Sequence, residues 1–245
     1  QGMAGYDPAD CASIDMPVPD FSAEIGGDVK GLRLVLCPDL VQIEIDKSVE
    51  NAFNEAVEVL RGLGAKIDTV ACSFADDLNN ERLPIADAEL LAVHRENIDN
   101  HPEKYGDDVR ARIENARNTT LAMYFEALKK KVILIREMEA LFAPYDGLLL
   151  PAYSCIGAPI DTVMATINGK QIPFLGASRP LTGPHNFTGF PSHVVPTGLS
   201  PNENMPVAMQ VVGLPGAEAR VLCIAHAYEQ ATPEVRNRLP EILKS

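Results

Sequence analysis

A strand–helix–strand pattern in the first third of the chain sets the strongest limit on its fold. The apolar run Leu32–Cys37 has the length of a buried strand. Asp46 or Ser48 can cap the helix that follows, which carries apolar residues at helical spacing and ends near Gly62. Ala65–Ala71 then forms a second run of strand length. Since a crossover helix joins parallel neighbours, this pattern predicts an α/β fold in which the two strands are parallel.

The rest of the chain alternates between helix and strand patterns. We expect a helix over residues 84–99 that starts at Pro84, because proline is favoured in the first helical turn. The helical pattern over 107–143 weakens at Asn118-Thr119-Thr120, which predicts two helices or a bend. Thr166–Ile172 predicts a β-hairpin, since Asn168-Gly169 tolerates the positive φ angles of a type I′ turn. The other expected elements are strands at 147–150, 193–195 and 207–212 and helices at 216–231 and 233–243.

Residues 1–31 are predicted to form an extended arm, with residues 32–245 forming the α/β part. Pro17, Pro19, Gly26 and Gly27 interrupt any helix in the arm. The opening Gln1-Gly2-Met3 is not a natural translation start. It predicts that the chain is part of a longer protein, or one chain of a processed protein.

Composition excludes several classes of partner. A chain of 245 residues fits one large domain, and its net charge of −13 disfavours a phosphate backbone as the main partner. No apolar run approaches the roughly 18 residues that span a bilayer. The five cysteines are scattered and lack C-x-x-C pairing, which favours free thiols in a reducing compartment and predicts a cytoplasmic protein. We therefore expect neither nucleic acid nor a membrane among the partners.

No catalytic motif is recognisable in the chain by itself. The five histidines form no H-E-x-x-H sequence and no cluster with cysteine at zinc spacing, so no metal site is expected. The sequence has no G-x-S-x-G elbow, no phosphate loop and no G-x-G-x-x-G motif. It predicts no cofactor.

One segment, Pro184–Pro191, is dense in Gly, Pro and Asn and precedes the expected strand at 193–195. Asn186 can bond nearby backbone groups and Gly189 can take a positive φ, so the segment predicts a rigid turn that leads into a core strand. The alternative interpretation is a wall of a binding site at the end of that strand.

Six short pieces, in order along nearly the whole chain, resemble the C-terminal part of the amidase signature family. The pieces are Gly5-Tyr6-Asp7-Pro8, Lys30-Gly31-Leu32-Arg33, Phe142-x-x-Tyr145-Asp146-x-x-Leu149-x-Pro151, Asn186-x-x-Gly189-x-Pro191, Val195-Pro196-x-Gly198 and Pro206-Val207-x-x-Gln210-x-Val212-Gly213, with Glu229 in the last long helix. Each piece alone is a weak signal, but their order together is fairly specific. The resemblance implies an α/β fold in which a mixed β-sheet is covered by helices on both faces, this chain being its C-terminal half.

The resemblance also implies that the catalytic groups lie outside this chain. Family members hydrolyse amides with a lysine and two serines, and all three precede the Gly-Tyr-Asp-Pro piece with which this chain begins. None of the chain's serines lies in a Gly/Ser-rich run. We therefore expect no catalytic residue in this chain. Its expected partner is the N-terminal part of the same enzyme, which would belong either to missing sequence of the same polypeptide or to a separate chain.

Three interpretations of the function follow. The first is a C-terminal fragment or chain of an amide-bond hydrolase. Its substrates would be small amides, esters or carbamates, and the whole enzyme could form a homodimer. The second is the amidase subunit of a tRNA-dependent amidotransferase. The third, from another class, is a non-catalytic α/β binding module, which the lack of a nucleophile motif supports.

Candidate substrate-binding residues lie where strand ends meet loops, the place where open α/β sheets bind ligands. In hydrolases that this chain resembles, the segment before Asn-x-x-Gly-x-Pro reaches the acyl side of the substrate. We therefore expect Thr182 and His185 to bind substrate, with Tyr153, in the loop after the strand at 147–150, behind them. The structural alternative is that His185 only packs its ring over the turn.

Overall fold

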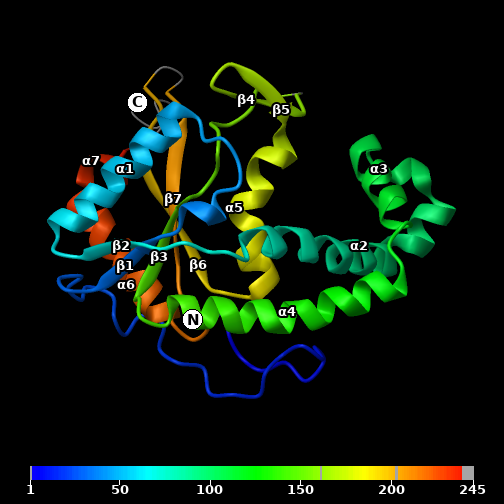
Figure 1. Cartoon of the computed structure of the whole chain (residues 1–245), viewed down its shortest axis with the longest axis horizontal. Helices are drawn as coiled ribbons and strands as arrows, with labels where there is room; N and C mark the ends of the chain where they lie inside the picture. Colours follow the sequence, from blue (N-terminus) through cyan, green and yellow to red (C-terminus); the bar gives the residue numbers. More distant parts are fainter. Residues whose placement is uncertain (1, 161, 202–203, 239–245) are drawn as a thin grey trace.

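The computed structural model describes residues 2–160, 162–201 and 204–238. A five-stranded mixed sheet lies at its centre, in the order β2-β1-β3-β7-β6, and β4 and β5 form a separate hairpin (Figure 1). The strands are β1 (Arg33–Leu36), β2 (Lys66–Thr69), β3 (Gly147–Pro151), β4 (Met164–Ile167), β5 (Lys170–Pro173), β6 (Ser192–Leu199) and β7 (Pro206–Val212). The helices are α1 (Lys47–Gly62), α2 (Ala75–Asn100), α3 (Asp107–Ala116), α4 (Leu121–Phe142), α5 (Phe174–Thr188), α6 (Glu218–Ala231) and α7 (Pro233–Arg236), with short 3-10 turns at Pro38–Leu40 and Pro102–Lys104.

The sheet confirms the predicted parallel pair and extends it. β1 is parallel to β2, with Arg33 opposite Lys66, and parallel to β3 on its other side, with Leu34 opposite Gly147. β7 is antiparallel to both β3 and β6. The sheet is therefore mixed, and β2 and β6 form its edges.

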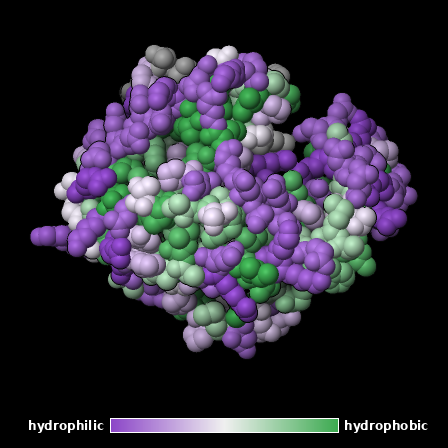
Figure 2. Space-filling model, viewed as in Figure 1, coloured by the Kyte–Doolittle hydropathy of each residue, from purple (hydrophilic) through white to green (hydrophobic). Residues whose placement is uncertain are grey.

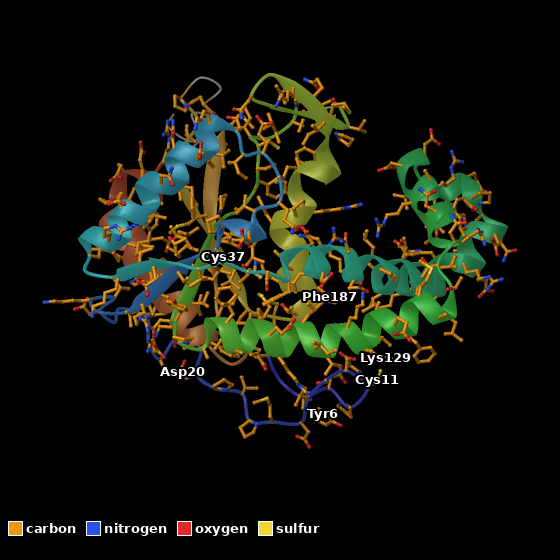
Figure 3. The ribbon with its side chains drawn as sticks, in the orientation of Figure 1. Tyr6, Cys11, Asp20, Cys37, Lys129 and Phe187 are labelled. Atoms are coloured by element: carbon orange, nitrogen blue, oxygen red, sulfur yellow. The ribbon has the colours of Figure 1, made fainter. Side chains whose placement is uncertain are left out.

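Helices cover both faces of the sheet, as expected. Alternate side chains of a strand point to opposite faces, so Leu149 packs with α1 and α6 on one face, while Leu148 and Leu150 pack with α2 and α4 on the other. Phe187 of α5 (labelled in Figure 3) packs with Leu148 and Leu150 on the second face. Lys131 Nζ of α4 lies 5.5 Å from the centre of the Phe187 ring. The two cores together fix the sheet between two helical layers.

The arm at residues 2–31 contains turns but no helix or strand. Figure 3 shows the arm running past α4, with Tyr6, Cys11 and Asp20 along it. Cys11 is exposed, whereas the other four cysteines are buried, and all five are free. Near the end of the arm, Val29 is buried in the core. No helix in the described part of the chain is long and apolar enough to cross a membrane.

Two helix boundaries differ from expectation and one agrees. The predicted start at Pro84 is wrong, because the helix begins at Ala75 and Pro84 lies inside it. Ala75 and Leu78 are buried against α4 and the sheet, and this packing outweighs the missing amide of the proline. The predicted break near Asn118-Thr119-Thr120 is confirmed: α3 ends at Ala116, and Thr120 caps α4 by accepting a bond from the amide of Met123. Of the expected helix at 233–243, α7 covers Pro233–Arg236, and residues 239–245 lie outside the described residues.

The prediction of a rigid turn before β6 is partly wrong. Residues 184–188 form the C-terminal end of helix α5, although this helix contains Pro180 and Pro184. Asn186 lies exposed on this helix. The helix ends at Gly189, whose φ of 79° is left-handed and whose amide donates to the carbonyl of His185 at 2.8 Å. The positive φ predicted for Gly189 is thus confirmed, in the role of a helix cap.

Gly189→Val should lower the free energy of unfolding by about 2 kcal/mol, because a β-branched residue is strained at positive φ. The space around Gly189 is open, so the cost is conformational and not a clash. Gly189→Asn is the matched control, since asparagine tolerates this region, and it should cost less than about 1 kcal/mol. Urea unfolding of both variants measures the difference; equal stabilities would show that the cap conformation carries no strain.

Candidate binding site

The carboxyl ends of the parallel strands β1 and β3 point to one end of the sheet, the place where open α/β sheets bind ligands. The loop after β3 begins there with Ala152-Tyr153-Ser154 and meets the first turn of α5. The hairpin β4–β5 joins this loop to α5 and is adjacent to both in Figure 1. Loop, hairpin and helix therefore converge at the strand ends.

Gln210 on β7 ties two of these elements together. Its Nε2 donates to the carbonyl oxygens of Pro151, at the end of β3, and Leu181, in α5, at 3.1 and 2.9 Å. Its Oε1 accepts from the Ser192 hydroxyl at 3.2 Å. The side chain is 3 % exposed, so these bonds form away from competing water. Gln210 thereby fixes α5 relative to the strand end, in spite of the two prolines in that helix.

Ser154 makes a second link between the loop and α5. Its hydroxyl is fully buried and donates to the carbonyl of Ala177 at 2.6 Å, and its own carbonyl accepts from the amide of Asp46 at 2.7 Å. This hydroxyl lies next to Tyr153 in the chain, but burial and its bond to a helix carbonyl remove it as a nucleophile. Its role is to hold the loop in place.

The hairpin is clamped to the segment before α1 through its turn. Asn168 and Gly169 both have positive φ, 48° and 82°, which confirms the predicted hairpin turn. The Asn168 side chain accepts from the amide of Lys47 at 3.0 Å, and its Nδ2 donates to Glu44 Oε1 at 2.9 Å. The Asp46 carboxylate accepts from the amide of Asn168 at 3.1 Å. Hydrogen bonds to Ser48 and Asn168 outweigh partial burial and lower the pKa of Asp46, so it stays ionised in this clamp.

One cavity adjoins this clamp and a second lies beside Tyr153. A cavity of about 550 Å³ lies at the ends of β1 and β3, with Leu36, Leu150, Lys47 and Asn168 among its lining residues. A second, of about 310 Å³, is lined by Tyr153 and Phe174, whose ring centres are 5.9 Å apart, and by apolar residues of β6 and β7. Both have the size and largely apolar lining of small-molecule sites.

The three predicted binding residues occupy two places. Tyr153 is 39 % exposed and lines the smaller cavity at the first turn of α5. Thr182 and His185 lie three residues apart on one face of α5, near its other end. Since a helix rises 1.5 Å per residue, His185 lies ~16 Å along the axis from Phe174, the ring against which Tyr153 packs. The structure thus brings Thr182 and His185 together and leaves Tyr153 apart from them.

His185 is buried, with 4 % of its surface exposed. Within the described part of the chain neither of its ring nitrogens has a hydrogen-bond partner, and burial lowers its pKa to about 4. The imidazole is therefore neutral near pH 7. Thr182 is half-buried. A neutral ring can line or support an apolar pocket, but it offers no positive charge to a substrate.

The arrangement supports binding and positioning. In the described residues no group of three His, Cys, Asp or Glu side chains is placed to hold a metal ion. The residues that sequence reasoning missed are the positioning groups Gln210, Ser154 and the Asp46–Asn168 pair. Gln210 had a signal as a polar residue in the otherwise apolar strand Val207–Val212, whereas Asp46 and Asn168 were expected only as a helix cap and a turn residue.

The comparisons with known proteins agree on one family. The Amidase family model matches residues 1–222. An amidase of Pseudomonas putida is 30 % identical over 244 residues, which cover 99 % of this chain and 52 % of that protein. A glutamyl-tRNA(Gln) amidotransferase subunit of Geobacter metallireducens is also 30 % identical, over 95 % of this chain and 52 % of its own length.

Solved structures agree in fold. An inhibitor-bound vestigial protein complex, linked to the evolutionary origins of an s-triazine catabolic enzyme, matches with a TM-score of 0.84 at 24 % identity, over 97 % of this chain and 51 % of the matched chain. A bacterial aryl acylamidase of the amidase signature enzymes matches with a TM-score of 0.76 at 22 % identity, over 96 % and 51 %. At these identities the likeness shows the fold. The chain spans about half the length of the curated relatives it matches.

Proposed function

This chain belongs to the amidase signature family, and on that premise we propose that it is the C-terminal part of an enzyme that hydrolyses amide bonds. One observation carries the proposal: the family match runs through residues 1–222, while the chain covers only about half of each relative. The missing half would be the N-terminal part of the enzyme, on the same polypeptide or on a separate one.

The open edge of the sheet supports a partner of this kind. Among the described residues, β6 pairs with β7 on one side and with no strand on the other, and Val194 near its centre is 55 % exposed. An unpaired strand with exposed apolar side chains is a surface on which further chain can pair. The N-terminal part would complete the sheet at such an edge.

In the proposed enzyme, the chemistry resides on the N-terminal part and the positioning on this chain. The family resemblance implies that one serine attacks the amide carbonyl while its proton passes through a second serine to a neutral lysine. Backbone amides would stabilise the oxyanion, and the amine would leave as the proton returns to it. Loop 152–160, the hairpin and α5 would form one wall of the pocket, held by Gln210 and Ser154.

A second candidate is the amidase subunit of a tRNA-dependent amidotransferase. It rests on the 30 % identity to the Geobacter metallireducens protein, equal to that of the Pseudomonas putida amidase. The two candidates differ in their requirements, because the amidotransferase needs partner subunits and a route for ammonia, whereas the amidase acts on small amides without them.

Co-expression with an N-terminal part tests the proposal. The parent assembly should hydrolyse a simple amide such as benzamide, whereas residues 1–245 alone should show none of this activity. The isolated chain should also aggregate, because an apolar edge of its sheet stays uncovered. A second N-terminal part, with its Ser-Ser pair changed to Ala-Ala, is the control that keeps the fold. Hydrolysis by the isolated chain, or a monomeric and cooperatively melting isolated chain, would contradict the proposal and favour a self-standing module.

We also propose that Thr182, His185 and Tyr153 bind the substrate. Thr182→Ala and His185→Ala in the complete enzyme should change the relative kcat/KM among acyl groups, by ~10- to 200-fold for a methylene-sized change of contact. Tyr153→Phe, which keeps the ring, is the milder variant for comparison. An amide, ester and carbamate panel measures the ranking, and an unchanged ranking in both alanine variants would place the pocket elsewhere.

A further inference from the structure

Three arginines from distant parts of the sequence meet beside α5. Arg82 lies on α2, Arg112 on α3 and Arg179 on α5, and Figure 1 shows α5 near one end of α2 and α3 near the other. All three are partly buried. Burial lowers the pKa of Arg82 most, and the positive charges of Arg179 and Arg112 lower it further. Three like charges therefore lie close enough to repel one another.

Acidic side chains of the described residues balance this charge only in part. Asp87 Oδ1 lies 3.1 Å from Arg112 Nη2. Within the described part of the chain, neither Arg82 nor Arg179 forms an ion pair, and Arg82 Nε is buried without a hydrogen-bond partner. Buried guanidinium groups are normally paired, so this arrangement is costly unless an anion completes it. It is also unexpected in a chain with a net charge of −13.

A cavity adjoins the cluster. It has a volume of about 430 Å³ and lies between α2, α3 and α5, with Arg112, Arg179, Asp87 and Asn115 among its lining residues. Figure 2 shows a hollow between the part that carries the hairpin and the part that carries α3. Asp108, an exposed residue in the first turn of α3, also lines the cavity. The three arginines exceed the two carboxylates by one charge, which matches a monoanion better than a phosphate.

The position of Arg82 is fixed by a glycine. A Cβ atom added at Gly183 of α5 would lie 2.9 Å from Arg82 Cδ and 3.0 Å from its Cζ. The guanidinium therefore rests directly on the helix backbone, where another residue would displace it. A fixed, partly desolvated guanidinium keeps its positive charge close to Arg112 and Arg179 and so favours an anion between them.

We propose that Arg112 and Arg179 bind the carboxylate of a small ligand in this cavity, and that the nearby charge of Arg82, which does not itself line the cavity, strengthens the attraction. The planar guanidinium group matches a carboxylate and forms two parallel hydrogen bonds with it. The Asn115 amide adds a neutral polar group, and Leu83 and Val109 offer apolar contact for the remainder of the ligand. The bound carboxylate would offset the repulsion among the arginines. This inference stands independently of the reaction proposed above.

Calorimetric titration of the assembled enzyme with sodium propionate and with its neutral analogue propionamide tests the site. We expect propionate to bind at least tenfold more tightly. Arg179→Gln and Arg82→Gln should each weaken propionate binding at least tenfold, and Gly183→Ala should do the same by displacing Arg82. Arg110→Gln is the matched control, an α3 arginine paired with Asp107 instead, and it should bind propionate as the parent does.

Binding is read as heat, so an assembly that hydrolyses no amide still tests the site. Competition with substrate would identify the ligand as the substrate's own carboxylate, and independent binding would identify a separate carboxylate effector; both support the site. Equal affinity of the parent for propionate and propionamide would overturn it, as would unchanged propionate affinity in the two arginine variants. The parent would bind propionate and propionamide equally if an acidic side chain of the N-terminal part already occupied the cavity.

Discussion

Gln210→Leu is expected to lower the free energy of unfolding by about 3 kcal/mol. Leucine has nearly the same volume but cannot donate, so the carbonyls of Pro151 and Leu181 lose the hydrogen bonds that the side chain gives them. Each buried acceptor left unpaired costs about 1–3 kcal/mol. Urea unfolding of the assembled enzyme, compared with the parent under the same conditions, measures the loss.

Ser192→Ala is the matched control for this change. It removes the bond to Gln210 Oε1 but leaves both donated bonds in place, and Ser192 is an exposed residue. Its cost should stay under about 1 kcal/mol. Equal losses of unfolding free energy in the two variants would show that the two donated bonds do not stabilise the fold, and that Gln210 does not hold α5 to the strand end.

The fold was predictable where local signals and packing agree. The unit from β1 through α1 to β2 has apolar runs of strand length, an Asp46 cap and a helix with one buried face, and all three signals indicate the same structure. The break at Thr120 follows from its side chain, which caps a helix better than it extends one. The resemblance to a known family then supplied the two-sided sheet, which local patterns alone do not give.

Two of the corrections concern proline. Pro84 indicated a helix start and Pro184 a turn, yet both lie within helices, as does Pro180. In α5 the carbonyls of Ala177 and Leu181 accept bonds from Ser154 and Gln210, side chains distant in the sequence. Such tertiary contacts stabilise a helix that local propensity disfavours, and a local pattern contains no trace of them.

The candidate site, like the fold, was predictable from the sequence only in part. Tyr153 was expected to bind substrate behind Thr182 and His185, by the rule that loops at strand ends bind ligands, and it does line a cavity at a strand end. The separation of Tyr153 from His185 depends on the length of α5, which the sequence interpretation treated as a turn. The cluster of Arg82, Arg112 and Arg179 unites residues up to 97 positions apart in the sequence, so only the packing of three helices reveals it.

His185 should make the enzyme lose stability as the pH falls from neutral to 4. Burial lowers its pKa from 6.5 to about 4 in the folded protein, whereas the unfolded chain keeps the ordinary value. Above pH 6.5 the ring is neutral in both states and contributes no pH dependence. Between pH 6.5 and 4 only the unfolded state binds the proton, so unfolding is favoured, by about 2 kcal/mol at pH 5 and about 3 kcal/mol at pH 4.

His185→Leu isolates this contribution from that of the carboxylates, which titrate equally in both proteins. Leucine has no proton to bind, and it replaces a ring whose two nitrogens lack partners among the described residues, so stability at pH 7 should change little or rise. The difference in unfolding free energy between variant and parent should therefore grow in favour of the variant as the pH falls from 7 to 5. Urea unfolding at several pH values measures it. A constant difference would mean that the folded protein admits the proton, and that His185 is hydrated or paired in the assembled enzyme.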